Sequence, residues 1–128
     1  EPMPVIQYAI NNKTDLGNEF YTFQRVKDES VKYICPAPIP EALTKTLQAI
    51  AVQAYASVHC RDFGRVDFRV DEKGAPFVLE INPLPNLSKK DTFFYVAKAL
   101  KQPFEALVLR ALNEGLERLN LRKQEVNV

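Results

Sequence analysis

The fold is decided by two alternating stretches, Arg65-Val66-Asp67-Phe68-Arg69-Val70 and Phe77-Val78-Leu79-Glu80-Ile81-Asn82, on either side of Asp71-Glu72-Lys73-Gly74. In the first stretch charged and apolar side chains alternate. The second stretch opposes its odd-numbered residues, which are all apolar, to its even-numbered ones. A half-buried strand alternates in this way because successive side chains point to opposite faces. The four residues between the stretches are a turn signal. We therefore predict a β-hairpin over residues 64–82.

The polar face of this hairpin carries the first candidate site. If the chain turns around residues 72–75, Asp67 lies opposite Glu80 and Arg65 opposite Asn82, with Cβ atoms roughly 5 Å apart. Two facing carboxylates repel each other unless a positive charge lies between them. Carboxylate and amide oxygens are the ligands that Mg²⁺ prefers, so a divalent cation fits. The alternative is that these side chains are only the solvated face of an amphipathic hairpin, and periodicity alone does not choose between the two.

The rest of the chain is expected to supply a strand, a β-prone segment over residues 19–26 that leads into a mobile loop, and three helices. Residues 3–10 have a strand pattern, and prolines at positions 36, 38 and 40 separate the next segment from a helical stripe over residues 41–58. Asp91 is a candidate N-cap for a helix over residues 91–101, and Pro103 opens another over residues 103–119. We predict an α+β fold in which an antiparallel β-sheet is backed by helices.

Composition excludes several classes of partner. The 128 residues contain 17 Lys and Arg against 16 Asp and Glu, and the net charge of +1 gives no field that would attract nucleic acid or an anionic membrane. No apolar run is long enough to cross a bilayer. Cys35 and Cys60 have no metal-type spacing, and the chain does not open with a signal peptide, so we expect free thiols and a cytoplasmic protein. The abrupt start in a strand-like run suggests a cut inside a larger protein.

The amino-acid sequence of the hairpin and its flanks also resembles that of a known family. Cys60-Arg61-Asp62-Phe63-Gly64-Arg65-Val66-Asp67-Phe68, followed after the turn by Leu79-Glu80-Ile81-Asn82-Pro83-Leu84-Pro85, resembles the ATP-grasp ligases, and most closely the D-alanine–D-alanine ligase family. The resemblance extends upstream through Tyr33-Ile34-Cys35-Pro36-Ala37-Pro38 and downstream into the last helices. It implies that the chain is the C-terminal, metal-binding subdomain of an ATP-grasp fold.

The resemblance also implies roles for the polar residues of the hairpin. Asp67 and Glu80 correspond to the carboxylates that hold Mg²⁺, or Mn²⁺ in its place, against the phosphates of ATP, and Asn82 corresponds to the amide ligand. Arg65 corresponds to the guanidinium that stabilises charge on the transferred phosphoryl group. In such ligases ATP phosphorylates a carboxylate and an amine attacks the acyl phosphate, which forms a peptide-type bond. The substrates would be small amino acids or similar compounds, as in peptidoglycan biosynthesis.

A basic side chain before the helix is expected to reach a phosphate. Residues 20–33 resemble the mobile loop that closes over the site in this family. Arg25 stands nearest the position of the family's basic residue, which is usually Lys, and Lys27 is its rival. The alternative interpretation makes both ordinary surface charges.

The segment after Pro85 departs from the family. Asn86-Leu87-Ser88 stands where Gly-Phe-Thr is usual, and we expect it to contact substrate. Asp91 stands near the Ser that binds the second substrate's carboxylate, which an acidic group would repel, so the acceptor is not necessarily D-alanine. Asp91 is more simply a helix cap, and Lys89 or Lys90 is then the candidate partner of a substrate carboxylate.

The adenine-binding and phosphate-binding parts that such enzymes place N-terminal to this segment are not in the sequence. We therefore expect the 128 residues alone to be inactive, although the full-length protein would be an enzyme. Apolar surface normally covered by the missing half would be exposed, so a homodimer is one way of covering it. The rival hypothesis is a non-catalytic ATP-grasp remnant or interaction module.

Overall fold

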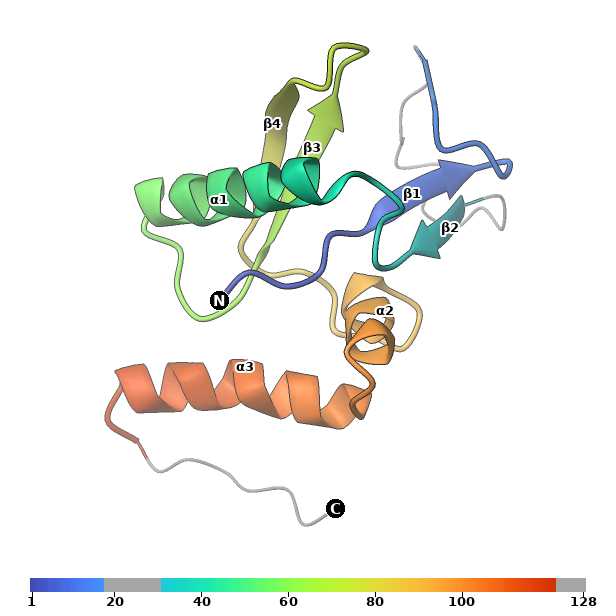
Figure 1. Ribbon diagram of the computed structural model, residues 1–128. Helices are drawn as coiled ribbons and strands as arrows, with labels where there is room; N and C mark the ends of the chain where they lie inside the picture. Colours follow the sequence, from blue (N-terminus) through green and yellow to red (C-terminus); the bar gives the residue numbers. More distant parts are fainter. Residues whose placement is uncertain (18–30, 122–128) are drawn as a thin grey trace.

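The computed structural model describes residues 1–17 and 31–121, which form an α+β fold (Figure 1). The elements follow in the order β1 (Gln7–Ile10), β2 (Val31–Ile34), α1 (Glu41–Ser57), β3 (Arg65–Val70), β4 (Pro76–Asn82), α2 (Thr92–Ala99) and α3 (Phe104–Arg118). The predicted fold class is confirmed.

The predicted antiparallel sheet is present as two two-stranded sheets. β1 pairs with β2, and β3 pairs with β4, each pair antiparallel. Helix α1 packs against both strands of the β3–β4 hairpin, whereas α2 packs against β2 and α3. In Figure 1 the hairpin rises beside α1, and α2 links that half of the molecule to α3 below. The residues between β4 and α2 therefore lead from the hairpin to the helix that packs against the β1–β2 sheet.

The strand predicted over residues 3–10 is wrong for its first four residues, since β1 begins at Gln7. Pro4 has no backbone N–H to give to a strand partner. The carbonyls on either side of it bond outside a sheet instead. The Met3 carbonyl accepts from Gln48 Nε2 at 2.9 Å, and the Val5 carbonyl accepts from the Ala37 N–H at 2.8 Å.

Residues 20–30 of the mobile loop predicted over residues 20–33 lie outside the described residues. Its last part is wrong, because residues 31–33 belong to β2. Tyr33 pairs with Tyr8 of β1, and their ring centroids are 5.2 Å apart. A strand partner so far away in sequence is not visible in the local composition around residue 31.

The helices predicted over residues 41–58, 91–101 and 103–119 correspond to α1, α2 and α3, each shorter by one to three residues. Each of these helices is followed, directly after its C-cap residue, by a residue of positive φ. These residues are His59 (55°), Lys101 (55°) and Asn120 (54°). This left-handed residue closes a helix by letting the following N–H reach back, as Cys60 N–H does to the Tyr55 carbonyl at 3.2 Å.

A cluster of buried apolar side chains lies where α2 meets α3. Val96, Ala97 and Leu107 form this cluster, and partly buried hydrophobic residues pack around it: Met3, Ile6, Cys35, Phe93 and Phe104. No helix in the described residues is both long and apolar enough to span a membrane.

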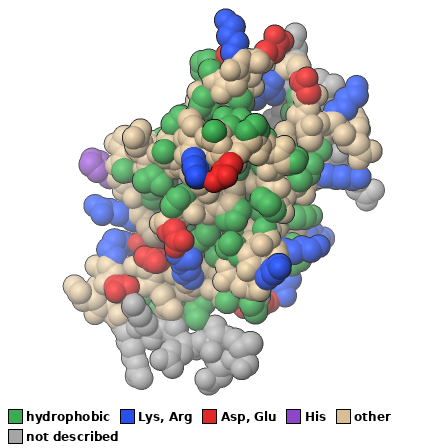
Figure 2. Space-filling model, viewed as in Figure 1, with side chains coloured by type: hydrophobic (Ala, Val, Ile, Leu, Met, Phe, Trp, Pro, Cys, Tyr) green, Lys and Arg blue, Asp and Glu red, His purple; other side chains and the backbone are tan. Residues whose placement is uncertain are grey.

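Apolar side chains are also exposed, on β4. Leu79 is 63% and Phe77 55% exposed, and Figure 2 shows hydrophobic side chains scattered among the charged ones on one face of the molecule. Apolar side chains scattered in this way are common on protein surfaces, and the homodimer stays a prediction.

Candidate functional site

The hairpin brings the four predicted polar residues together in two facing pairs. Arg65 pairs with Asn82 and Asp67 pairs with Glu80, so the predicted register is confirmed. The register then shifts between Asp67 and Phe68, because Phe68 pairs with Val78 and leaves Leu79 as an extra residue on β4. Such a bulge bends the strand and increases its twist.

The bulge corrects one detail of the predicted hairpin faces. The alternation of the sequence places Phe77 with Leu79 and Ile81, away from the charged residues. In the structure Phe77 pairs with Arg69, and directly opposed residues share a face, so Phe77 lies on the charged side. The extra residue at Leu79 resets the alternation by one position.

Arg65 is held by the carboxylate two residues further along its own strand. Its Nε donates to Asp67 Oδ1 at 2.7 Å and its Nη2 donates to Asp67 Oδ2 at 2.9 Å. Both side chains are 26% exposed. Burial acts to lower the pKa of Arg65, but the hydrogen bonds to Asp67 and the neighbouring Tyr8 and Asp91 outweigh it and raise the pKa above its usual value. Arg65 is thus a fixed positive charge.

The oxygen atoms of Asp67, Glu80 and Asn82, which lie near Arg65, meet part of what a hard cation requires. Asp67 and Glu80 are facing carboxylates, and Glu80 is exposed, so it can turn toward an ion. Asn82 Oδ1 accepts the Leu84 N–H at 3.0 Å, which uses one lone pair of the amide oxygen and leaves the other. Within residues 1–17 and 31–121 no group of three His, Cys, Asp or Glu side chains could hold a metal ion. Two carboxylates with one amide fit an ion that takes its remaining ligands from water or phosphate.

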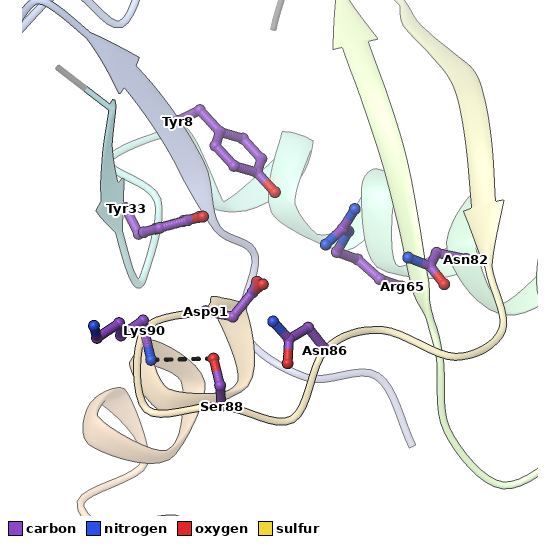
Figure 3. A pocket seen from close by; sticks show the side chains of 8 residues that line it. All are labelled: Tyr8, Tyr33, Arg65, Asn82, Asn86, Ser88, Lys90 and Asp91. Carbon is purple, nitrogen blue, oxygen red and sulfur yellow. Dashed lines mark hydrogen bonds between the residues drawn. The ribbon is translucent and has the colours of Figure 1, made fainter. Parts of the chain in front are cut away.

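A pocket of about 430 Å³ opens beside Arg65, between the two sheets and the start of α2 (Figure 3). Its volume is in the range of small-molecule sites. Its walls come from β1, β2, the hairpin and the segment between β4 and α2, and its lining residues are Tyr8, Tyr33, Arg65, Asn82, Asn86, Ser88, Lys90 and Asp91.

The pocket receives two of the three residues predicted to contact substrate. Asn86 and Ser88 line it, whereas Leu87 lies outside its wall and is 37% exposed. Asp67 and Glu80 are not among the lining residues either, so the candidate metal position and the pocket are adjacent and are linked through Arg65 and Asn82. Arg25 and Lys27 lie outside the described residues.

The sequence left open the roles of three charged residues before α2, namely Lys89, Lys90 and Asp91, and the structure gives each a different environment. Asp91 caps α2, since its Oδ1 accepts the Thr92 N–H at 2.6 Å, and it also lines the pocket. Lys89 pairs with Glu105 at 2.6 Å. Lys90 contributes to the wall, but its side chain extends away from Arg65 in Figure 3. The predicted helix cap is therefore confirmed.

Sequence reasoning missed Tyr8 and Tyr33 as pocket residues. Their side chains lie together on one face of the β1–β2 sheet, and in Figure 3 both hydroxyls point toward the space between Arg65 and Asp91. The strand pattern of residues 3–10 placed Tyr8 on a strand. Nothing local to it indicated that this strand would face the hairpin.

A contact behind the site fixes where β3 begins. The Tyr55 hydroxyl of α1 lies within hydrogen-bond distance of the Arg61 carbonyl and, at 2.7 Å, of the Phe63 carbonyl. The Tyr55 ring covers Gly64, where an added Cβ would lie 2.5 Å from Cε2 of the ring and 3.0 Å from the Asn82 carbonyl oxygen. Glycine therefore permits the close approach of helix and hairpin just before Arg65.

Comparison with known proteins agrees with this architecture. Residues 5–113 match the family model described as D-ala D-ala ligase C-terminus. The chain is 33% identical over 114 residues to a D-alanine–D-alanine ligase of Hydrogenovibrio crunogenus, covering 88% of this chain and 34% of that protein. It is 35% identical over 117 residues to the D-alanine–D-alanine ligase of Pseudoalteromonas translucida, covering 91% of this chain and 36% of that protein.

The chain thus spans about a third of the length of the curated relatives that it matches. The family match covers most of the chain and includes the hairpin, the pocket segment, α2 and the first ten residues of α3. The chain therefore belongs to the family of D-alanine–D-alanine ligase C-terminal domains.

Proposed function

We propose that the full-length protein carrying this chain is an ATP-dependent carboxylate–amine ligase of the D-alanine–D-alanine ligase kind. It would join two small amino acids, or a similar carboxylate and amine, through an acyl phosphate, and it would act in the cytoplasm. The 128-residue chain supplies the hairpin that binds Mg-ATP and is inactive alone.

One observation carries the proposal: the facing pair Asp67 and Glu80 beside the pair Arg65 and Asn82. Asp67 is already paired with Arg65, so a cation would use the remaining lone pairs of the Asp67 carboxylate together with the exposed carboxylate of Glu80. The neighbouring guanidinium supplies fixed positive charge, which is what phosphoryl transfer needs most from a protein.

We assign the metal to Asp67, Glu80 and Asn82, with Mg²⁺ as the ion and Mn²⁺ as a substitute. When bound, the ion supplies Lewis acidity and charge neutralisation at the phosphates. The residues themselves act by orientation. Asp67 holds the guanidinium of Arg65 through two hydrogen bonds, so Arg65 is positioned at the edge of the pocket before any substrate arrives.

Further roles follow for residues around this centre. We assign the ATP phosphates to Arg25 or Lys27 in the segment before β2, and the substrate to Asn86, Leu87 and Ser88 before α2. Asn86 and Ser88 line the pocket, which supports their part in this assignment.

The test measures ATP-dependent phosphate release by the full-length protein with D-alanine and Mg²⁺. Asp67→Asn and Glu80→Gln remove one charge each at the proposed metal position. Glu72→Gln removes one charge from the exposed turn of the same hairpin and is the matched control. We expect the first two variants to lose at least about 100-fold in kcat and to need more Mg²⁺, because an ion that contributes several kcal/mol has lost a ligand, whereas Glu72→Gln keeps wild-type activity.

The outcomes separate the hypotheses. Equal activity in the three variants would remove the metal assignment and leave the ligase. No phosphate release with D-alanine or with a panel of other amino acids, in the presence of Mg²⁺ or Mn²⁺, would instead support the non-catalytic module.

A further inference from the structure

One short segment of the chain is contacted by all three helices. Residues 61–64, here called the entry segment, lead from α1 to the first residue of β3. The ring of Phe63 lies edge-on to Phe93 of α2, with ring centroids 5.8 Å apart. The Asp62 carboxylate accepts two hydrogen bonds from Arg118 of α3, at 2.9 and 2.8 Å. Side chains of the entry segment are thus held from α2 and from α3.

Tyr55 of α1 contacts the backbone of the same segment. Its hydroxyl lies within hydrogen-bond distance of the Arg61 carbonyl and 2.7 Å from the Phe63 carbonyl. Burial raises the pKa of Tyr55, so the hydroxyl keeps its proton and donates it between the two oxygens. Asp62, which separates the two carbonyls, has a φ of 65°, a left-handed conformation that few residues other than glycine adopt. One hydroxyl therefore holds the backbone on both sides of a left-handed residue.

The ring of Tyr55 reaches the other end of the entry segment. A Cβ added to Gly64 would lie 2.5 Å from Cε2 of this ring and 3.0 Å from the Asn82 carbonyl oxygen. The ring, Gly64 and the end of β4 are therefore in close contact. Arg65 follows Gly64 directly and pairs with Asn82 across the hairpin. Tyr55 thus supports the backbone next to both members of this pair.

The side chain of Arg65 depends on the geometry at this point. Its guanidinium donates to both carboxylate oxygens of Asp67, which requires residues two apart to share one face of an extended strand. Arg65 is the first residue of β3, so the extended geometry has to begin where the entry segment ends. In Figure 3 the guanidinium points into the space between the two sheets. A change in the path of the entry segment would move the guanidinium or loosen its bonds to Asp67.

We propose that Tyr55 is a positioning residue for Arg65: its hydroxyl fixes the backbone of the entry segment and thereby sets the place of the guanidinium. The inference rests on the proposed ligase function for the reaction that Arg65 serves. Tyr55 does not line the pocket, so its effect on catalysis passes through Arg65. The effect is large because a displacement of about 1 Å can lower a rate by about 100-fold.

The first experiment observes Arg65 without any reaction. The full-length protein is labelled with ¹⁵N-arginine, and the Nε–H signal of Arg65 is identified by its loss in Arg65→Lys. Tyr55→Phe removes the hydroxyl and keeps the ring beside Gly64. Tyr95→Phe is the matched control, because Tyr95 is a half-buried tyrosine on α2 that keeps its ring contacts in this variant.

We expect the exchange of the Arg65 Nε–H with water to rise at least about fivefold in Tyr55→Phe and to stay within about twofold of wild type in Tyr95→Phe, because only the first variant opens the start of β3. Equal exchange in wild type and Tyr55→Phe overturns the inference. A wild-type signal that already exchanges too fast to be observed also overturns it, since the guanidinium would then not be held.

The second experiment measures ATP-dependent phosphate release. Tyr55→Phe should lower kcat at least about tenfold and leave KM for ATP within about threefold, because a displaced Arg65 loses contacts that form only in the transition state. In an Arg65→Lys background the same substitution should change kcat less than about twofold, because the group that it positions is absent. A wild-type kcat in Tyr55→Phe, or an equal loss in both backgrounds, refutes the positioning role. If Arg65→Lys has no measurable rate, the comparison of kcat with KM and the Nε–H signal decide.

The two experiments separate this inference from the ligase proposal. No phosphate release by the wild-type protein with any amino acid refutes the ligase, and a Tyr55-dependent Nε–H signal then still shows that Tyr55 holds Arg65 in place. Phosphate release with an unchanged kcat in Tyr55→Phe leaves the ligase and refutes the role of Tyr55.

Discussion

Gly64→Ala tests whether the contact between α1 and the hairpin determines the position of the site. An alanine Cβ at this position would lie 2.5 Å from Cε2 and 3.3 Å from Cδ2 of Tyr55, and 3.0 Å from the Asn82 carbonyl oxygen. The first distance is well inside van der Waals contact, and the third involves backbone, which cannot rotate away. One of the two elements must move.

The loss of stability expected for Gly64→Ala depends on how firmly Tyr55 is held in place. Its hydroxyl lies 2.7 Å from the Phe63 carbonyl, so swinging the ring aside loses a hydrogen bond of about 1 kcal/mol. Overpacking a filled site typically adds about 1 to 3 kcal/mol. We expect Gly64→Ala to lower the free energy of unfolding by about 2.5 kcal/mol, and the midpoint by about 10 °C at about 3 to 5 °C per kcal/mol.

The assay is thermal and urea unfolding of the chain, followed by circular dichroism. Gly115→Ala is the matched control, because the same methyl group added in the last turn of α3 would meet only the Asp62 side chain, at 3.4 Å from Oδ2 and 3.7 Å from Cγ, which are ordinary contacts. Alanine is the better helix former, so Gly115→Ala should stabilise the chain by about 0.5 to 1 kcal/mol. If Gly64→Ala changes stability by less than about 0.5 kcal/mol, or stabilises as Gly115→Ala does, the close approach is not a constraint.

Three smaller effects can be measured in the same unfolding assay. The two hydrogen bonds from Arg118 lower the pKa of Asp62, so the ion pair stabilises the chain above the ordinary aspartate pKa of about 4 and is lost as pH falls through the lowered value. Asp62→Asn should therefore cost up to about 1 kcal/mol at pH 7 and progressively less as pH falls below about 4, and a cost that does not change with pH would show that the charge is irrelevant. His59→Gly should stabilise by about 0.5 kcal/mol because φ is 55° there, and a loss would mean that the imidazole makes a contact of its own. Thr92→Val should be neutral or stabilise by about 1 kcal/mol, because Thr92 Oγ1 is buried without a hydrogen-bond partner among the described residues, and a loss above 1 kcal/mol would reveal a partner.

The hairpin was predictable because its information is local. The turn residues 71–74 and the alternation on either side identify the two strands and the turn between them. The pairing of Arg65 with Asn82 also needs the bulge, because counting back from the pair Val70 and Pro76 without it would place Arg65 opposite Ile81. The bulge at Leu79 was not predictable in the same way. Five residues, 71–75, separate the paired ends Val70 and Pro76, and the sequence does not state at which position β4 gains its extra residue.

The pocket was less predictable because it forms between elements that are distant in sequence. Tyr8 and Tyr33 come from β1 and β2, while Arg65 comes from the hairpin, and only the packed fold brings them around one space. Their residue types gave no signal, since tyrosine is common in ordinary strands.

Asp91 shows why the chemistry of this site needed both kinds of information. Its position before an apolar helical pattern predicted a cap, and the cap is present. A cap uses one oxygen and no net charge, so the helix accounts for the residue, and only the family resemblance placed Asp91 near the second substrate as well. The structure adds that the second oxygen has no partner in the described residues, that Arg65 is already bonded to Asp67, and that all of this borders a pocket of substrate size. The same side chain therefore forms both the helix cap and part of the pocket wall, and only the packed structure shows the second of these directly.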